Sequence, residues 1–160
     1  MNEDCFHLGI KAVIRNGQGK VFLLEVNPES LKEYSGPTYW DLPGGRMNRN
    51  ETVEETLRRE ITQETKIPNV RIVAPLIMIL SKIRIPLGEI HLPLVDKPIH
   101  LKDVGLILWL YMCEAPTAME VEVSDEHLSF QWFTPAEAAS LLSVKYPEQA
   151  TDAIRALGYS

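Results

Sequence analysis

The chain has 160 residues, with 45% hydrophobic and 24% charged side chains, a length and mixture typical of one globular domain spanning residues 1–160. Its net charge of -6 at neutral pH makes it a poor candidate for duplex nucleic acid, which is bound through a basic face. The longest apolar runs, Ile72–Leu80 and Val104–Cys113, are too short to cross a membrane. The acidic start of the sequence differs from the basic start of a signal peptide. We therefore expect a soluble, cytoplasmic protein with no membrane partner.

The amino-terminal part of the chain predicts a β-hairpin, a loop and a short strand. Residues Phe6–Arg15 and Val21–Val26 are apolar and β-branched, and a glycine-containing turn separates them. Residues 27–38 hold two prolines and mostly polar neighbours, which predicts a surface loop. An extended segment is predicted at Trp40-Asp41-Leu42, and Pro43-Gly44-Gly45 ends it.

The segment from Thr52 to Thr65 is the clearest helix in the sequence. Thr52 followed three residues later by Glu55 is typical of a capping box, and Pro68 limits the helix beyond its end. Apolar residues at every fourth position predict its buried stripe: Val53, Leu57 and Ile61.

The second half of the chain predicts more strands, an insertion and two helices. Val70–Ile85 predicts one or two strands with a break at Pro75, and Val104–Cys113 predicts a strand buried on both faces. A proline-punctuated insertion at residues 86–103 separates them. The last elements are a strand at Ser129–Phe133, a helix starting at Thr134-Pro135-Ala136-Glu137, and a helix at Pro147–Leu157. Strands and helices do not alternate regularly, so the expected fold class is α+β, with a mixed sheet flanked by helices.

One edge of the predicted helix carries groups that can bind a cation. At about 100° per residue, Glu60 and Glu64 lie about 40° apart, and Gln63 lies about 60° from Glu60 on the other side. Carboxylates held together at the rim of a core repel each other unless a cation neutralises them, and such oxygen ligands suit Mg²⁺ or Mn²⁺ better than zinc. Taken alone, the helix favours a solvated surface with i,i+4 ion pairs. The glycine loop at a fixed distance before it favours the cation site.

The glycine loop and the helix together resemble the Nudix box, Gly-x5-Glu-x7-Arg-Glu-U-x-Glu-Glu-x-Gly-U, in which U is a bulky aliphatic residue. Gln63 stands in place of the first glutamate of the pair, and Lys66 in place of the second glycine. The resemblance extends from about Trp40 to Leu142. The matching residues are Gly45, Glu51, Arg59, Glu60, Ile61, Glu64 and Ile67.

The resemblance implies an α/β/α sandwich with a mixed sheet, and hydrolysis of a pyrophosphate bond in a nucleoside diphosphate linked to another group, such as a nucleoside triphosphate. It also implies Mg²⁺ or Mn²⁺ as cofactor, held by Glu60, Gln63, Glu64 and a backbone carbonyl of Gly44 or Gly45. The implied catalytic residues are Glu64, Arg59, which would orient a glutamate, and Glu126, a base or ligand from the loop before the last strand.

The substrate-binding side is less well defined by the sequence. Arg46 and Arg49 in the glycine loop could contact phosphates or simply face solvent, and Trp40 could stack on a base or lie in the core. We expect a small-molecule nucleotide as partner, while the sequence leaves open which nucleotide, the number of metal ions, the role of the insertion at residues 86–103, and whether the chain is a monomer or a homodimer. Because Gln63 brings no negative charge, a catalytically weak or inactive nucleotide-binding or regulatory module is the alternative. A structural protein that kept only the scaffold is the third.

Overall fold

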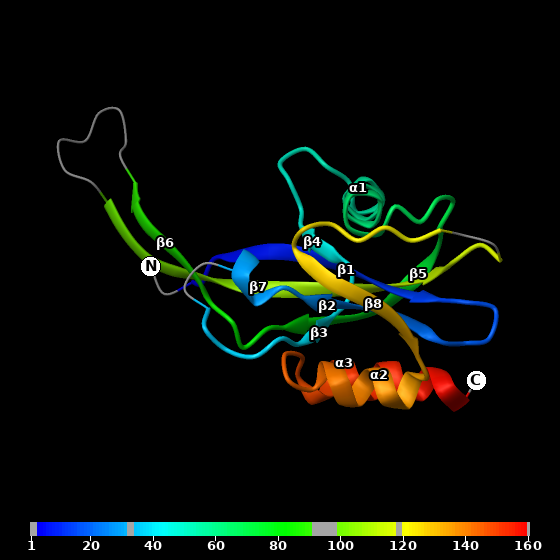
Figure 1. Ribbon diagram of the computed structural model, residues 1–160. Helices are drawn as coiled ribbons and strands as arrows, with labels where there is room; N and C mark the ends of the chain where they lie inside the picture. Colours follow the sequence, from blue (N-terminus) through cyan, green and yellow to red (C-terminus); the bar gives the residue numbers. More distant parts are fainter. Residues whose placement is uncertain (1–2, 32–33, 91–98, 118–119, 160) are drawn as a thin grey trace.

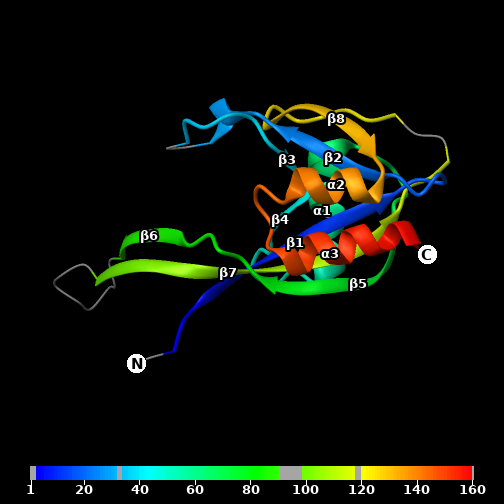
Figure 2. The same cartoon turned by 90° about the horizontal axis from the view of Figure 1, so that it is seen from below.

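The computed structural model describes residues 3–31, 34–90, 99–117 and 120–159, and in it a mixed sheet lies between two layers of helices (Figure 1). Helix α1 (Val53–Thr65) covers one face of the sheet. Helices α2 (Pro135–Leu142) and α3 (Glu148–Ala156) lie side by side on the other face (Figure 2). The expected α/β/α sandwich is thus confirmed.

The sheet has eight strands, and β1 and β7 lie at its centre. The main path runs β3-β2-β1-β7-β5, while β4 pairs with β1, β6 with β7 and β8 with β2. β1 and β7 run parallel, and the other pairs are antiparallel. The bounds are β1 (Phe6–Arg15), β2 (Val21–Val26), β3 (Trp40–Asp41), β4 (Gly44–Arg46), β5 (Arg71–Leu80), β6 (Ile85–Ile90), β7 (Ile99–Glu114) and β8 (His127–Phe133).

Strand β1 is apolar along its length because both of its faces are covered. Successive side chains of a strand point to opposite faces. Ile10 and Ile14 therefore pack with Leu57 of α1, while Val13 packs with Leu142 of α2. The predicted hairpin strands have the predicted bounds. However, β1 pairs with β2 only beside the turn, and its long partner is β7.

The helices begin where the sequence predicts, with one difference in the cap of α1. The Thr52 hydroxyl accepts a hydrogen bond from the Glu55 amide at 3.2 Å, but Glu55 does not complete a capping box. α2 has both halves of its box, from Thr134 and Glu137. None of the helices in the described part of the chain is long and apolar enough to span a membrane.

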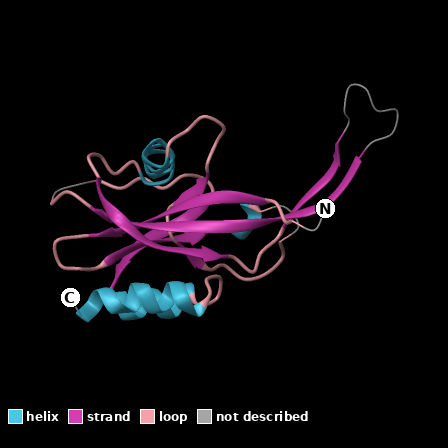
Figure 3. Cartoon of the chain, turned by 180° about the vertical axis from the view of Figure 1, so that it is seen from behind, coloured by secondary structure: helices cyan, strands magenta, loops and turns pink. Residues whose placement is uncertain are grey.

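The insertion at residues 86–103 contains a second hairpin, which extends β7 beyond the sheet. β7 begins at Ile99 rather than at Val104, and β6 pairs with it from Ile85↔Val104 outward. This β6–β7 arm leaves the body of the molecule as two paired strands (Figure 3). Residues 91–98 lie outside the described residues. β5 is one strand rather than two, because a register shift after Pro75 accommodates the missing amide.

Candidate functional site

Strand β4 brings two glycines against the acidic edge of α1. Gly44 and Gly45 pair with Lys11 and Ile10 of β1. Gly44 has a φ of 145°, and a Cβ there would lie 2.1 Å from the Ile10 carbonyl oxygen, so only glycine permits this pairing. A Cβ on Gly45 would lie 2.5 Å from Oε1 of Glu60. The backbone of the glycine loop is therefore in direct reach of the helix carboxylates.

Glu64 is a buried carboxyl group, 6% exposed, beneath this loop. Its Oε1 accepts a hydrogen bond from the Gly44 amide at 2.8 Å. Burial raises the pKa of Glu64 to about 8; the charge of Lys11 opposes this rise and the neighbouring Glu60 adds to it. The protein groups alone therefore favour the neutral acid at Glu64, and a divalent cation would favour the carboxylate.

Arg59 joins two glutamates to the glycine loop. Its Nε and Nη2 donate to the two carboxylate oxygens of Glu51 at 2.7 and 2.9 Å. Its Nη1 donates to Oε1 of Glu60 at 2.5 Å, and Nη2 also donates to the Arg46 carbonyl at 3.2 Å. The hydrogen bonds from Arg59 and from the Asn48 amide lower the pKa of Glu51 to about 2. Glu60 is thereby held in place with its second oxygen free of this guanidinium.

The predicted metal ligands converge on one groove of about 480 Å³. One wall comes from β4 and α1, and the opposite wall comes from the loop before β8. Gln63 is exposed at the rim, and Glu126 is exposed across the groove. The lining residues are Gly44, Gly45, Glu60, Gln63, Glu64, Ser124, Asp125 and Glu126.

His127 lies beside two lining residues of this groove, Glu64 and Ser124, and no pattern in the sequence indicated it. Its Nε2 lies 3.4 Å from Oε2 of Glu64, and both side chains are 7% exposed. Its Nδ1 lies 3.4 Å from the Ser124 hydroxyl. Burial lowers the pKa of His127, so the neutral imidazole is favoured. Potential ligand atoms of Glu64, Glu126 and His127 all lie within 4.8 Å of one another.

A second cavity of about 710 Å³ adjoins the groove at Gly45. Basic side chains from four separate segments line it, and no acidic side chain is among its described lining residues. The apolar part of the wall comes mainly from β7 and the start of the β6–β7 arm. The basic residues are Lys11, Arg46, Arg84 and Lys145, and the aliphatic residues include Ile83, Ile85, Leu106 and Leu108.

Asp41, which is not among the described lining residues, forms ion pairs with two of these basic side chains. Its carboxylate accepts hydrogen bonds from the Tyr146 hydroxyl and from Nζ of Lys145, both at 2.5 Å. Lys11 lies farther away, with Nζ 3.4 Å from the same carboxylate and 3.2 Å from the Leu42 carbonyl. A lysine within an apolar strand and an aspartate directly before the glycine loop were the signals in the sequence for this network.

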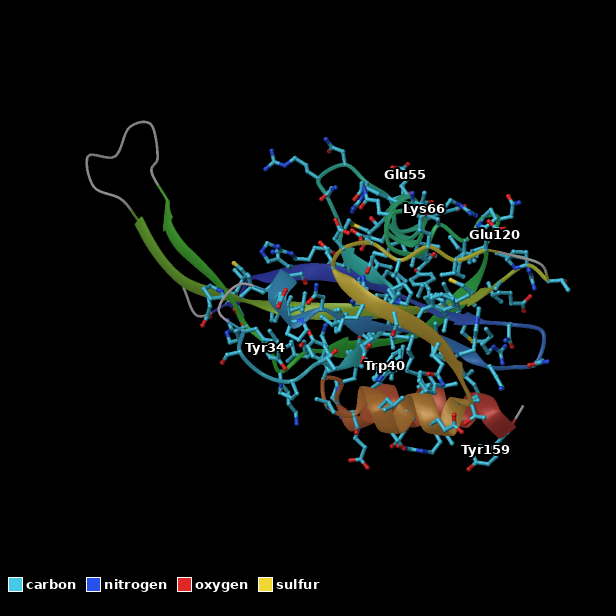
Figure 4. All side chains as sticks on the ribbon, in the orientation of Figure 1. Tyr34, Trp40, Glu55, Lys66, Glu120 and Tyr159 are labelled. Atoms are coloured by element: carbon cyan, nitrogen blue, oxygen red, sulfur yellow. The ribbon has the colours of Figure 1, made fainter. Side chains whose placement is uncertain are left out.

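The structure places the remaining predicted substrate residues outside the groove. The Arg46 side chain lines the second cavity, and Arg49 is exposed on the loop before α1. Trp40 packs edge-to-face on Phe133, with ring centroids 5.0 Å apart, in the apolar cluster beneath α2 and α3. Figure 4 shows Trp40 on that side of the sheet and Lys66 on the α1 side. Trp40 is thus half-buried against this cluster, and its stacking on a base stays a prediction.

The donor set of the groove fits a divalent cation. It offers carboxylate oxygens, an amide oxygen from Gln63 and backbone carbonyls at the glycine loop, which are the ligands that Mg²⁺ and Mn²⁺ take. The raised pKa of Glu64 fits as well, because clustered buried carboxylates lack a full counter-charge from the protein. His127 adds a nitrogen donor at the same place.

Comparisons with known proteins identify a family match and similar folds. The sequence matches the NUDIX domain over residues 6–154, and no match to a curated protein was found. The fold is similar to that of the MutT protein from Methanosarcina mazei Go1, with 22% identity, 99% of this chain and 97% of that chain covered, and a TM-score of 0.60. It is also similar to the E. coli dihydroneopterin triphosphate pyrophosphohydrolase (17% identity, 94% and 95% covered, TM-score 0.63) and to a C. elegans Ap4A hydrolase (17%, 93% and 93%, 0.59).

Proposed function

The chain belongs to the Nudix family, and from that premise we propose that it is a pyrophosphohydrolase, which cleaves a pyrophosphate bond in a nucleoside diphosphate linked to another group in a metal-dependent reaction. The observation that carries this proposal is the convergence of Glu60, Glu64 and Glu126 with the glycine backbone on one groove. Hydrolysis of a phosphoric anhydride requires charge neutralisation at the phosphates and a base for water, and this groove has residues for both.

The proposed cofactor is Mg²⁺ or Mn²⁺. Glu60, Glu64, the amide oxygen of Gln63 and a carbonyl of Gly44 or Gly45 would hold it. When bound, such an ion neutralises charge on phosphate oxygens and lowers the pKa of water. Gln63 contributes no charge, so we expect weaker cation binding than with a glutamate at that position.

Two residues act on the carboxylates and the water in this proposal. Arg59 holds Glu60 by a charge-assisted hydrogen bond and is itself fixed by the bidentate pair with Glu51. Glu126 faces the groove from the loop before β8. The backbone of this loop is fixed by a hydrogen bond from the Asn27 amide to the Glu126 carbonyl at 2.9 Å. We assign Glu126 as a base or ligand and Arg59 as a positioning residue.

The second cavity supports a nucleotide-type substrate. It adjoins the groove, and its basic lining residues include Lys11, Arg46 and Lys145. Asp41 pairs with the two lysines, and no described acidic side chain pairs with Arg46. Anionic groups attached to the scissile pyrophosphate would be attracted there. The aliphatic wall would take the less polar end of the substrate.

The test is hydrolysis of a panel of nucleoside triphosphates, dinucleoside polyphosphates and nucleotide sugars, with Mg²⁺ and with Mn²⁺, followed by chromatography of the nucleotide products. We expect activity from the wild type and a loss of at least about 100-fold in turnover for Glu64→Gln. Its amide oxygen can still accept from the Gly44 amide, so the fold should survive. Glu55→Gln, exposed on the same helix, is the matched control and should keep full activity.

Two results would contradict the proposal. An unchanged rate for Glu64→Gln would remove this residue from the mechanism. Tight nucleotide binding by calorimetry without turnover, and without dependence on metal, would favour the regulatory module that Gln63 suggests.

A further inference from the structure

Among the described residues, the buried imidazole of His127 has no hydrogen-bond partner at ordinary length. Its Nε2 is 3.4 Å from Oε2 of Glu64 and its Nδ1 is 3.4 Å from the Ser124 hydroxyl, whereas N–H···O bonds are usually about 2.7–3.2 Å long. Two ligands of one cation, each bonded at about 2.0–2.2 Å, lie about 3.0–3.5 Å apart. The spacing of His127 and Glu64 is therefore that of two ligands sharing an ion.

A β-bulge turns His127 toward the groove. In the pairing of β2 with β8, Glu25 faces Ser129 but Val26 faces His127, so that Leu128 is an extra residue. Regular alternation from Phe130, which stacks on Phe22 beneath α1, would point His127 to the opposite face of the sheet. The extra residue reverses this and brings the ring to Glu64 on the α1 side.

The loop around His127 is held by hydrogen bonds at its backbone. The His127 amide donates to the Ser124 carbonyl at 3.0 Å, and the Asn27 amide donates to the Glu126 carbonyl at 2.9 Å. The Ser124 hydroxyl lies near Nδ1, and in the tautomer that carries its hydrogen on Nδ1 the Nε2 lone pair faces Glu64. Histidines that bind metals usually donate their other ring N–H in this way.

We propose that His127 is a further ligand of the cation, its Nε2 acting beside the carboxylates of Glu64 and Glu126, and that this nitrogen makes the centre select Mn²⁺ over Mg²⁺. The inference rests on the proposed function, because it concerns the cation that the hydrolysis requires. Nε2 of His127 would give the cation one more ligand atom, at a centre where Gln63 contributes no negative charge. Mg²⁺ takes oxygen ligands and gives up water reluctantly, while first-row transition metals accept imidazole.

The test is pulsed EPR of the Mn²⁺-loaded protein, which detects ¹⁴N nuclei bound directly to the ion. We expect strong ¹⁴N modulation in the wild type, its replacement by a ¹⁵N signal when only the histidines carry ¹⁵N, and its loss in His127→Gln. His7→Gln, a change on β1, is the matched control and should keep the signal. The isotope experiment needs no variant, so it stands even if His127→Gln fails to fold.

Cation affinities give a second readout. From the EPR signal of free Mn²⁺, we expect His127→Gln to bind Mn²⁺ about tenfold or more weakly, while Mg²⁺ affinity, from competition, changes less than about threefold. Bound Mn²⁺ without ¹⁴N modulation, or an equal loss for both cations, would overturn the inference and leave the proposed hydrolysis intact. A wild type that neither binds Mn²⁺ nor hydrolyses any nucleotide of the panel would overturn both.

Discussion

Replacing Asp41 with asparagine removes the negative charge that two lysines share inside the fold. Asp41 is 5% exposed and accepts hydrogen bonds from Tyr146 and Lys145, while Nζ of Lys11 lies 3.4 Å away. Asparagine keeps the shape of the side chain but not its charge. Lys11 and Lys145 would then stand in the wall of the second cavity without a counter-ion.

The size of the loss follows from the burial of this network. Removing one partner of a buried ion pair costs about 3–5 kcal/mol. The Lys145 side chain is 20% exposed and can turn toward water, so we expect the lower end, about 3 kcal/mol. For a domain of this length, each kcal/mol lowers the melting temperature by about 2–4 °C, which gives a drop of about 9 °C.

The assay is urea unfolding at pH 7, with Asp152→Asn as the matched control. Asp152 pairs with Arg155 at 2.9 Å, but its side chain is 58% exposed, and loss of such a pair costs less than about 1 kcal/mol. In a Lys145→Met background, Asp41→Asn should lower the free energy of unfolding by less than in the wild type, because the unpaired ammonium group of Lys145 is then absent. A loss for Asp41→Asn that is below about 1 kcal/mol, or equal to that of the control, would refute the reasoning.

The same network predicts a pH dependence of stability. Burial alone would raise the pKa of Asp41, but the charges of Lys11 and Lys145 outweigh it and hold the pKa well below its usual value. A carboxyl group whose pKa is lower in the folded than in the unfolded state stabilises the fold fully above about pH 5. That contribution is lost as the pH falls toward the folded value. The stability difference between the wild type and Asp41→Asn should therefore shrink between pH 5 and pH 3.

Three further substitutions test other features. Lys66 ends α1 in the left-handed region, with φ 53°, so Lys66→Gly should stabilise the fold by about 1 kcal/mol in urea unfolding; a loss would show that the lysine makes a compensating contact. Gly44→Ala should destabilise by several kcal/mol or prevent folding, because of the close Ile10 carbonyl, whereas Gly17→Ala, with open space around it, should cost little. Gln63→Glu should tighten Mg²⁺ and Mn²⁺ binding in calorimetry, and a weaker affinity would argue against a ligand at this position.

The parts of the fold that the sequence predicted depend on local signals. A turn separates the first two strands, Thr52 caps the start of α1, and α2 begins with a complete capping box. The long pairing of β1 with β7 was not predicted, because strand partners are chosen by contacts between distant segments. The extension of β7 to Ile99 was not predicted, because the prolines in residues 86–103 indicated a loop. Proline is tolerated in an edge strand, and β6 is the edge strand that pairs with this part of β7.

The same distinction holds in the candidate site. Glu60, Gln63 and Glu64 could be placed on one edge of α1, because helix geometry fixes side-chain directions over one turn. His127 could not be placed, because it reaches Glu64 only through the extra residue Leu128, and a shift of one residue in strand register leaves no mark in composition or spacing. Asp41 lies in the extended segment predicted before the glycine loop, but its lysine partners come from distant segments.

The parallel pair at the centre of the sheet also determines how the chain must fold. Every residue of β1, from Phe6↔Gly105 to Arg15↔Glu114, is paired with a residue about 100 positions later, and closing a loop of that length costs about 4 kcal/mol of chain entropy. Native contacts of such high sequence separation place the domain among slowly folding topologies. During synthesis, β1 leaves the ribosome long before its principal partner exists. Until residue 114 has emerged, the earlier elements β2, β4 and α1 are the ones available to pair with or cover this strand.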